Sequence, residues 1–137
     1  MLGAQMRVAT PKGHGLPDEV AEAAGRIAVK GAELKQYVDP KEAVKGADAI
    51  YTDVWTSMGQ EVEYAERTKI FARYQVNDAM MGRAKPDALF MHCLPAHRGQ
   101  EVSDDVLESP ASVAFDQAEN RQHAQKAMLV LLFADKG

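Results

Sequence analysis

Short apolar runs alternate with longer amphipathic stretches along the chain. Five runs rich in β-branched or aromatic residues have the length and composition of buried strands. They cover residues 6–10, 33–38, 49–52, 88–92 and 112–115. Such continuous apolar runs are typical of strands that are buried on both faces, as in parallel sheets.

Helices are predicted between these runs. The first begins near Pro17, with acidic residues in the first turn, where the helix dipole favours negative charge. It continues through alanine-rich sequence to about Lys30, where Gly31 ends it. The other helices are expected at residues 39–46, 61–74, 76–82 and 117–133.

Strands that alternate with helices and short loops predict an α/β domain whose mostly parallel sheet is covered on both faces. The expected fold is a three-layer, Rossmann-like arrangement, and no repeat or linker divides residues 1–137.

Residues 1–5 have the sequence expected of the end of a helix, which leads directly into the first predicted strand. Because a doubly wound domain usually opens with a strand and its ligand loop, we expect the first strand of the sheet to be missing. An isolated chain of this kind is expected to associate.

Composition limits the classes of function. The net charge of -4, with no basic run longer than a pair, argues against nucleic-acid binding. The longest apolar run, residues 127–134, is too short for a membrane span. Cys93 is the single cysteine, so no intrachain disulfide can form, and residues 1–5 have neither the charge nor the length of a signal peptide. We therefore expect a soluble cytoplasmic protein that binds neither nucleic acid nor membrane.

Unusual polar sequence follows three of the predicted strands at their carboxyl ends, where parallel sheets bind ligands. Residues 53–59 read DVWTSMG, residues 93–99 read CLPAHRG, and residues 116–121 read DQAENR. We expect these loops to converge at one edge of the sheet. The first two then offer a carboxylate, a hydroxyl, backbone N–H groups and a thiol to one ligand.

Each of these residues also has an ordinary structural interpretation. Asp53 and Ser57 have the spacing of a loop or helix cap. A single cysteine at a strand end, such as Cys93, is commonly a small buried hydrophobe. Arg121 in the first turn of a helix would ordinarily be a solvated surface residue.

Metal and nucleotide sites are not supported by the spacing of the candidate ligands. His92, Cys93 and His97 could suggest zinc, but they form no CxxC or HxxxH pair and no fourth ligand is apparent. No G-x-G-x-x-G follows a predicted strand, which disfavours a nucleotide-binding Rossmann protein. We therefore expect no metal and no cofactor.

Taken together, the segments resemble the ornithine carbamoyltransferase family. Residues 53–59 are similar to its D-V-W-x-S-M-G loop, residues 92–96 (HCLPA) to its H-C-L-P segment, and residues 118–121 to its A-E-N-R helix start. Residues 9–13 (ATPKG) and 76–77 (VN) also match stretches of that family. The resemblance therefore runs through essentially the whole chain in order.

This resemblance implies that residues 1–137 are part of the ornithine-binding domain of an enzyme that joins L-ornithine to carbamoyl phosphate, giving citrulline and phosphate. It implies that the Asp53 carboxylate pairs with the α-ammonium of ornithine and that Ser57 supports the same group. The backbone N–H of Met58 would receive the α-carboxylate. Gly59 would let the loop close over substrate.

The second loop is implied to lie at the reacting end of the substrates. Cys93 and the Leu94 carbonyl would orient the δ-amine and the carbamoyl group without a covalent intermediate, and the Leu94–Pro95 bond would be cis. Arg121 would reach the carbamoyl phosphate oxygen where charge develops. His92 would support the loop rather than accept a proton.

The absence of two segments of the family changes the expectation for this chain. The phosphate-binding S-x-R-T and H-P-Q segments are absent, so the carbamoyl-phosphate domain is absent, and we expect no carbamoyl transfer by the chain alone. The full-length family is homo-oligomeric and built on trimers, largely through that other domain.

Two alternatives stay open. A related transcarbamylase could act on putrescine or an acylated ornithine, although the loop at Ser57 and Met58 suits a free α-amino acid. The chain could also be a non-catalytic amino-acid-binding or interaction module.

Overall fold

Four strands and a series of helices make up the computed structural model, which describes residues 3–56 and 64–134. The strands are β1 (Gln5–Ala9), β2 (Glu33–Tyr37), β3 (Ala49–Thr52) and β4 (Leu89–His92). The helices are α1 (Asp18–Ile27), α2 (Pro40–Ala43), α3 (Tyr64–Phe71), the 3-10 turn η2 (Ala72–Tyr74), α4 (Asp78–Met81), α5 (Asp104–Leu107) and α6 (Ala114–Phe133). The predicted alternation of strands and helices is confirmed.

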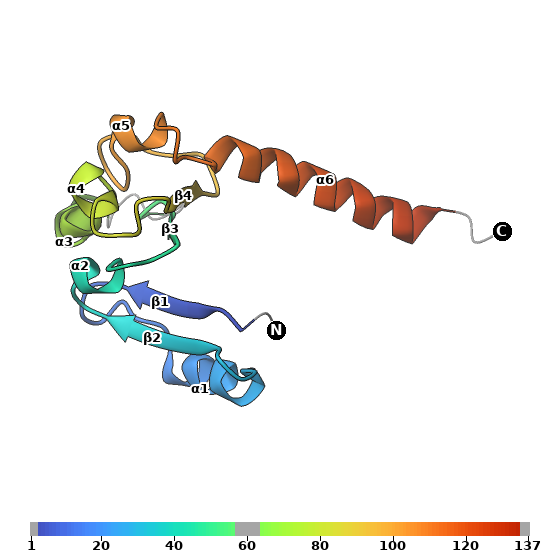
Figure 1. The fold of residues 1–137 in the computed structure, drawn as a ribbon, viewed down its shortest axis with the longest axis horizontal. Coiled ribbons are helices and arrows are strands. Elements are labelled where there is room, and N and C mark those ends of the chain that lie inside the picture. The colour runs from blue at the N-terminus through green and yellow to red at the C-terminus, as the bar shows by residue number, and fades with distance from the viewer. Residues whose placement is uncertain (1–2, 57–63, 135–137) are drawn as a thin grey trace.

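The strands form two parallel pairs. β1 pairs with β2, and β3 pairs with β4. Among the described residues the two pairs do not join into one sheet, and Figure 1 shows them apart, with β1 and β2 below β3 and β4. The parallel α/β class is therefore confirmed, and the sheet is interrupted between β1 and β3.

Two local predictions are wrong. The fifth strand, expected at residues 112–115, is reduced to one bridge between Ser112 and Phe90. The chain then turns into α6 at Ala114, because a short apolar run is compatible with either a strand or a buried helix start. The expected helical tail is also absent among the described residues, since Gly3 and Ala4 are not helical and Gln5 already belongs to β1.

The buried core lies around the second strand pair. Its cluster contains residues from β3, β4, α5 and the start of α6. They are Ile50, Val76, Phe90, Val102, Val106, Leu107 and Ala114. By contrast α1 has no buried residue, so the β1–β2 half of the described chain has little core of its own. The half with the core is also the half whose strands lead into the predicted site.

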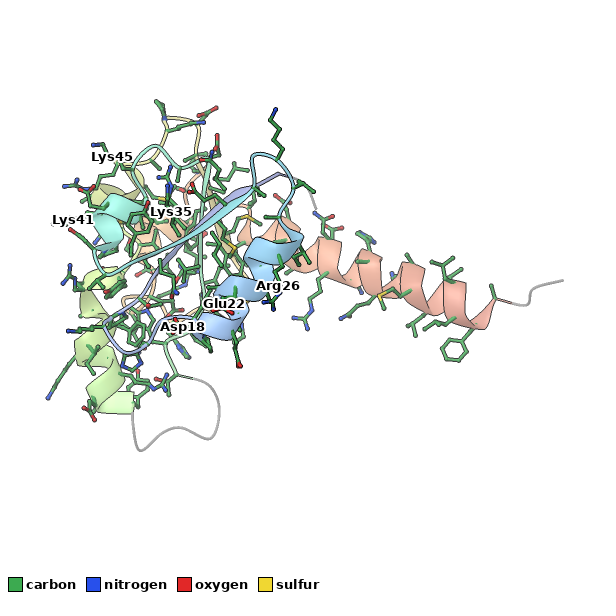
Figure 2. All side chains as sticks on the ribbon, turned by 90° about the horizontal axis from the view of Figure 1, so that it is seen from below. Asp18, Glu22, Arg26, Lys35, Lys41 and Lys45 are labelled. Carbon is green, nitrogen blue, oxygen red and sulfur yellow. The ribbon has the colours of Figure 1, made fainter. Side chains whose placement is uncertain are left out.

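Helix α6 extends away from the rest of the molecule (Figures 1 and 2). Its last residues are apolar on every side of the helix, yet the side chains from Met128 to Phe133 are 55% to 80% exposed. A helix that is apolar all round is normally buried against other protein. None of the described helices is both long enough and apolar enough to cross a membrane.

Candidate active site

The ends of β3 and β4 bring Asp53 and Cys93 together. Thr52 and His92 are partners in the parallel register of these strands, so the residues that follow them leave the sheet at the same edge. The Cys93 thiol donates a hydrogen bond to Asp53 Oδ1, with 3.0 Å between sulfur and oxygen. Asp53 Oδ1 also accepts from the backbone N–H of Val54 at 2.7 Å. The predicted convergence of these two loops is confirmed.

The Cys93 thiol is held in its protonated form. Burial raises the pKa of this thiol, and its hydrogen bond to the Asp53 carboxylate raises it further, because a thiolate beside an anion is disfavoured. The hydrogen bond with Cys93 in turn raises the pKa of the Tyr51 phenol, with a further contribution from burial. Since the nucleophilic form of cysteine is the thiolate, this setting suits a hydrogen-bond donor and not a nucleophile.

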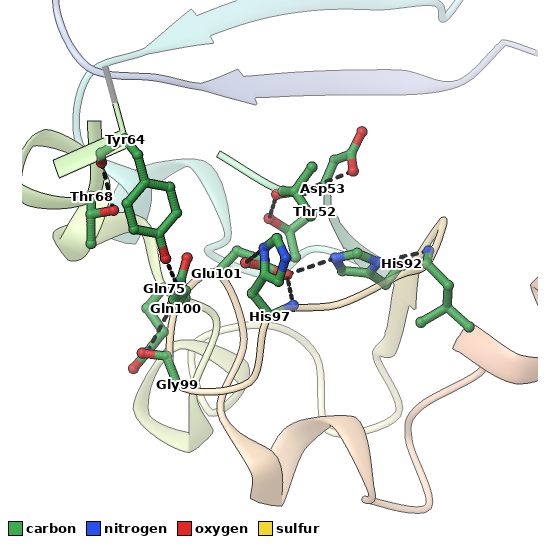
Figure 3. Close-up of polar contacts among 12 residues, drawn as sticks. Thr52, Asp53, Tyr64, Thr68, Gln75, His92, His97, Gly99, Gln100 and Glu101 are labelled. Atoms are coloured by element: carbon green, nitrogen blue, oxygen red, sulfur yellow. Dashed lines mark hydrogen bonds and ion pairs between the residues drawn. The ribbon is translucent and has the colours of Figure 1, made fainter. Parts of the chain in front are cut away.

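A buried histidine and a buried carboxylate hold the loop that carries Cys93 (Figure 3). His92 Nδ1 accepts from the backbone N–H of Leu94 at 2.8 Å. The proton of the neutral ring therefore sits on Nε2, which donates to Glu101 Oε1 at 3.2 Å. Glu101 Oε1 also accepts from the backbone N–H of His97 at 2.5 Å. Both ring nitrogens of His92 are occupied, so its predicted supporting role is confirmed.

Glu101 is a residue of the candidate site that the sequence did not reveal. Both His92 and Glu101 are 0% exposed, although a carboxylate in a polar loop is usually solvated. Its second oxygen, Oε2, is buried without a hydrogen-bond partner among the described residues and lies 4.0 Å from His97 Nδ1. The available signal was its position, eight residues after Cys93 in the same connection between β4 and α5.

Leu94 has an unusual backbone conformation in this loop. Its φ is 53°, in the left-handed region that few residues other than glycine adopt, and the Leu94–Pro95 peptide bond is cis, as the resemblance implied. The hydrogen bond from its N–H to His92 keeps this residue against the end of β4. The geometry of the Cys93–Leu94 segment is thus fixed by side chains buried behind it.

The remaining predicted site residues are not brought to this pair within the described chain. Ser57 and Met58, with Gly59, lie outside the described residues. Arg121 is the eighth residue of α6 and is not in its first turn, because that helix begins at Ala114. It is exposed, and no hydrogen bond or ion pair between described residues links it to Asp53 or Cys93. In residues 3–56 and 64–134, no group of three or more His, Cys, Asp or Glu side chains is placed to hold a metal ion.

A cavity of about 500 Å³ opens beside Asp53. Its aromatic wall is formed by Phe71, whose ring centroid lies 6.1 Å from that of Trp55, 5.8 Å from Tyr74 and 5.3 Å from His14. Trp55 thus packs its loop against α3, and Arg67 of the same helix donates a hydrogen bond to the Trp55 carbonyl at 3.4 Å. Cys93 does not line this cavity, so Asp53 lies between the cavity and the thiol.

The sequence that forms this site matches a known domain family. The profile of the Asp/Orn binding domain of aspartate/ornithine carbamoyltransferases matches residues 1–132. The chain belongs to this family. The ornithine carbamoyltransferase of Thermococcus kodakarensis is 57% identical over 132 residues, which cover 96% of this chain and 42% of that protein. The chain therefore spans about two fifths of the length of the relatives it matches.

Solved structures of family members have the same fold. The ornithine carbamoyltransferase of Pyrococcus furiosus superposes with a TM-score of 0.87 at 57% identity, over 95% of this chain and 42% of that one. An N-acetyl-L-ornithine transcarbamylase, solved with carbamyl phosphate and N-succinyl-L-norvaline, gives a TM-score of 0.79 at 29% identity, over 95% of this chain and 40% of that one. The Rossmann-like α/β class of this carbamoyltransferase domain is therefore shared with its relatives.

Proposed function

We propose that residues 1–137 form the ornithine-binding domain of an ornithine carbamoyltransferase, and that the carbamoyl-phosphate domain lies outside this chain. The observation that carries the proposal is the 3.0 Å hydrogen bond from the Cys93 thiol to Asp53, because it joins the two family motifs into one site. The relatives at 57% identity named ornithine carbamoyltransferase support the same substrate.

In this proposal the Asp53 carboxylate binds the α-ammonium of L-ornithine through a charge-assisted hydrogen bond. Its Oδ2 makes no hydrogen bond with other described residues and is free to accept one, while Oδ1 is held by Cys93 and Val54. Ser57 supports the ammonium, and the Met58 N–H receives the α-carboxylate. An exposed carboxylate beside a cavity of about 500 Å³ is consistent with a small, charged amino acid as the ligand.

The chemical step is the transfer of a carbamoyl group to the δ-amine. The amine nitrogen forms a bond to the carbonyl carbon, the bond from that carbon to the phosphate oxygen breaks, and the nitrogen loses a proton. Cys93 and the Leu94 carbonyl orient the amine and the carbamoyl group, and the protonated thiol donates rather than attacks. Arg121 would stabilise the charge on the carbamoyl oxygen when the complete protein places it there.

A chimaera tests this function directly. In it, these residues replace the matching 42% of the Pyrococcus furiosus ornithine carbamoyltransferase, so that the rest of the protein is supplied. With carbamoyl phosphate present, we expect citrulline from L-ornithine and much slower carbamoylation of putrescine or N-acetyl-L-ornithine. The Asp53→Asn chimaera should lose activity, and the Asp48→Asn chimaera should keep it, because Asp48 pairs with Lys85 away from the site.

Preference for N-acetyl-L-ornithine or putrescine over L-ornithine would contradict the proposed substrate. A folded chimaera that carbamoylates none of the three amines would contradict the enzymatic function and favour a binding module. That second candidate has one supporting observation, since the chain spans only about two fifths of its catalytic relatives.

A further inference from the structure

Gln75 holds part of the connection between β4 and α5. It follows η2 and lies directly before residues 76–77, which match the family. Its side-chain Nε2 donates to Gly99 O at 2.9 Å and to Gln100 O at 2.8 Å (Figure 3). One part-buried amide therefore satisfies two consecutive carbonyls of the loop that carries Glu101.

The backbone of the next residue continues this attachment. Val76 N donates to Glu101 O at 2.9 Å, and Ser103 N donates to Val76 O at 3.0 Å. Val76 is also buried in the core and forms a parallel bridge with Val102. Together with the bonds from Gln75, these contacts fix the backbone on both sides of Glu101.

A run of hydrogen bonds leads from Glu101 to the reacting end of the site. Glu101 Oε1 accepts from His92 Nε2 at 3.2 Å, and His92 Nδ1 accepts from the Leu94 N–H at 2.8 Å. The φ of Leu94 is 53°, a conformation that persists in a leucine only where the surrounding contacts enforce it. The direction of the Leu94 carbonyl therefore depends on the His92–Glu101 pair, and that pair depends on the loop that Gln75 holds.

We propose that Gln75 is a positioning residue for carbamoyl transfer, which holds Glu101 on His92 through the backbone of the loop. His92 in turn keeps the Leu94 carbonyl in the direction that orients the δ-amine. The inference rests on the proposed function, which gives that carbonyl its role. Among the described residues, Gln75 does not line the cavity beside Asp53, so its loss should slow the chemical step and leave ornithine binding unchanged.

Two glutamine variants of the Pyrococcus furiosus chimaera test this role. Gln75→Met keeps the length of the side chain and removes the amide, so Gly99 O and Gln100 O lose their donor. Gln100→Met is the matched control, since the Gln100 side chain donates to the Tyr64 hydroxyl while its backbone carbonyl still accepts from Gln75. Each variant therefore removes the side-chain amide of one glutamine that binds at the same loop.

We expect Gln75→Met to lower kcat by about tenfold or more, because a small displacement of an orienting group is costly to the rate. The KM for L-ornithine should stay within about twofold. Gln100→Met should keep both values within about twofold. If Gln75→Met does not fold in the chimaera, Gln75→Asn replaces it, because the shorter side chain keeps its polarity but cannot reach both carbonyls, and the same drop in kcat is expected.

Hydrogen exchange measured by NMR gives a second readout in the original chain, without catalysis. The Leu94 amide should exchange about threefold faster or more in the Gln75→Met chain, because the His92 ring that accepts from it is less firmly held. The same amide should exchange at an unchanged rate in the Gln100→Met chain.

Three results would overturn the proposal. The first is an unchanged kcat in a folded Gln75→Met chimaera, and the second is an equal loss of kcat in Gln75→Met and Gln100→Met. The third is an unchanged exchange rate at Leu94 in the Gln75→Met chain. An unsubstituted chimaera that makes no citrulline would instead contradict the proposed function, and exchange at Leu94 would still decide whether Gln75 holds this residue.

Discussion

Glu101 anchors the loop that presents Cys93, and its removal should destabilise the fold more than any surface change on the same loop. The perturbation is Glu101→Ala. Glu101 is 0% exposed and accepts hydrogen bonds from His92 Nε2 and from the backbone N–H of His97. Alanine leaves both donors without this acceptor, one at the fully buried His92 ring and one at the part-buried His97 N–H.

The magnitude follows from these two orphaned donors. A buried donor left unpaired, as at His92 Nε2, costs about 1–3 kcal/mol, and loss of the part-buried bond from the His97 N–H costs about 0.5–1.5 kcal/mol, so the two together should lower the free energy of unfolding by roughly 1.5–4.5 kcal/mol. Glu101→Gln keeps an acceptor oxygen in place of Oε1 but loses the charge, so we expect a smaller cost of about 1–2 kcal/mol. The order of stability should be Glu, then Gln, then Ala.

Urea unfolding followed by circular dichroism measures these differences, since the free energy of unfolding falls linearly with denaturant. Asp104→Ala is the matched control, because Asp104 follows on the same connection and its exposed side chain pairs with Arg98 at the surface. It should change stability little. Hydrogen exchange adds a local readout: the Leu94 amide should exchange faster in Glu101→Ala, because the His92 ring that accepts from it loses its anchor.

Equal unfolding midpoints for Glu101→Ala and Asp104→Ala would refute this reasoning. So would an unchanged exchange rate at Leu94 in a Glu101→Ala chain that remains folded, since the loop would then be held by something other than the His92–Glu101 pair.

Three further predictions concern the thiol, the cavity wall and activity. Alkylation of Cys93 by iodoacetamide should have its midpoint above the ordinary thiol pKa of about 8.5, and Asp53→Asn should move it to lower pH by removing the neighbouring anion; an unmoved midpoint would contradict this coupling. Tyr74→Phe removes the 2.5 Å hydrogen bond from Tyr74 to Val38 O and should cost about 1 kcal/mol in thermal unfolding, whereas Tyr37→Phe, which breaks no hydrogen bond of the described residues, should cost less. The purified chain alone should produce no citrulline from ornithine and carbamoyl phosphate, and citrulline formed by a preparation free of full-length enzyme would show this to be wrong.

Much of the fold was predictable because the strand signals are strong. The runs at β1 to β4 are short, apolar and separated by helical sequence, which predicts a parallel α/β fold. The start of α6 was not predictable, since Ser112 and Val113 continue the pattern of a strand while they bridge to Phe90, and the helix begins at the next residue, Ala114. Propensity does not distinguish these outcomes over four residues.

The site was predictable where two sequence motifs follow neighbouring strands. Asp53 and Cys93 are forty positions apart, yet the register of β3 and β4 places them side by side. Glu101 was not predictable, because burial of a carboxylate depends on tertiary contacts with His92 and His97 that no spacing encodes. Arg121 was predicted in the first turn of the last helix, and it lies in the third turn because α6 begins at Ala114.

A crystal structure of the Pyrococcus furiosus chimaera with bound L-ornithine tests the central claim most directly. We expect the α-ammonium nitrogen within about 2.7–3.2 Å of an Asp53 carboxylate oxygen and the δ-amine at the Cys93–Leu94 end of the same site. Ornithine bound elsewhere, or bound with Asp53 and Cys93 both free of contact with it, would contradict the assignment of this pair as the substrate site.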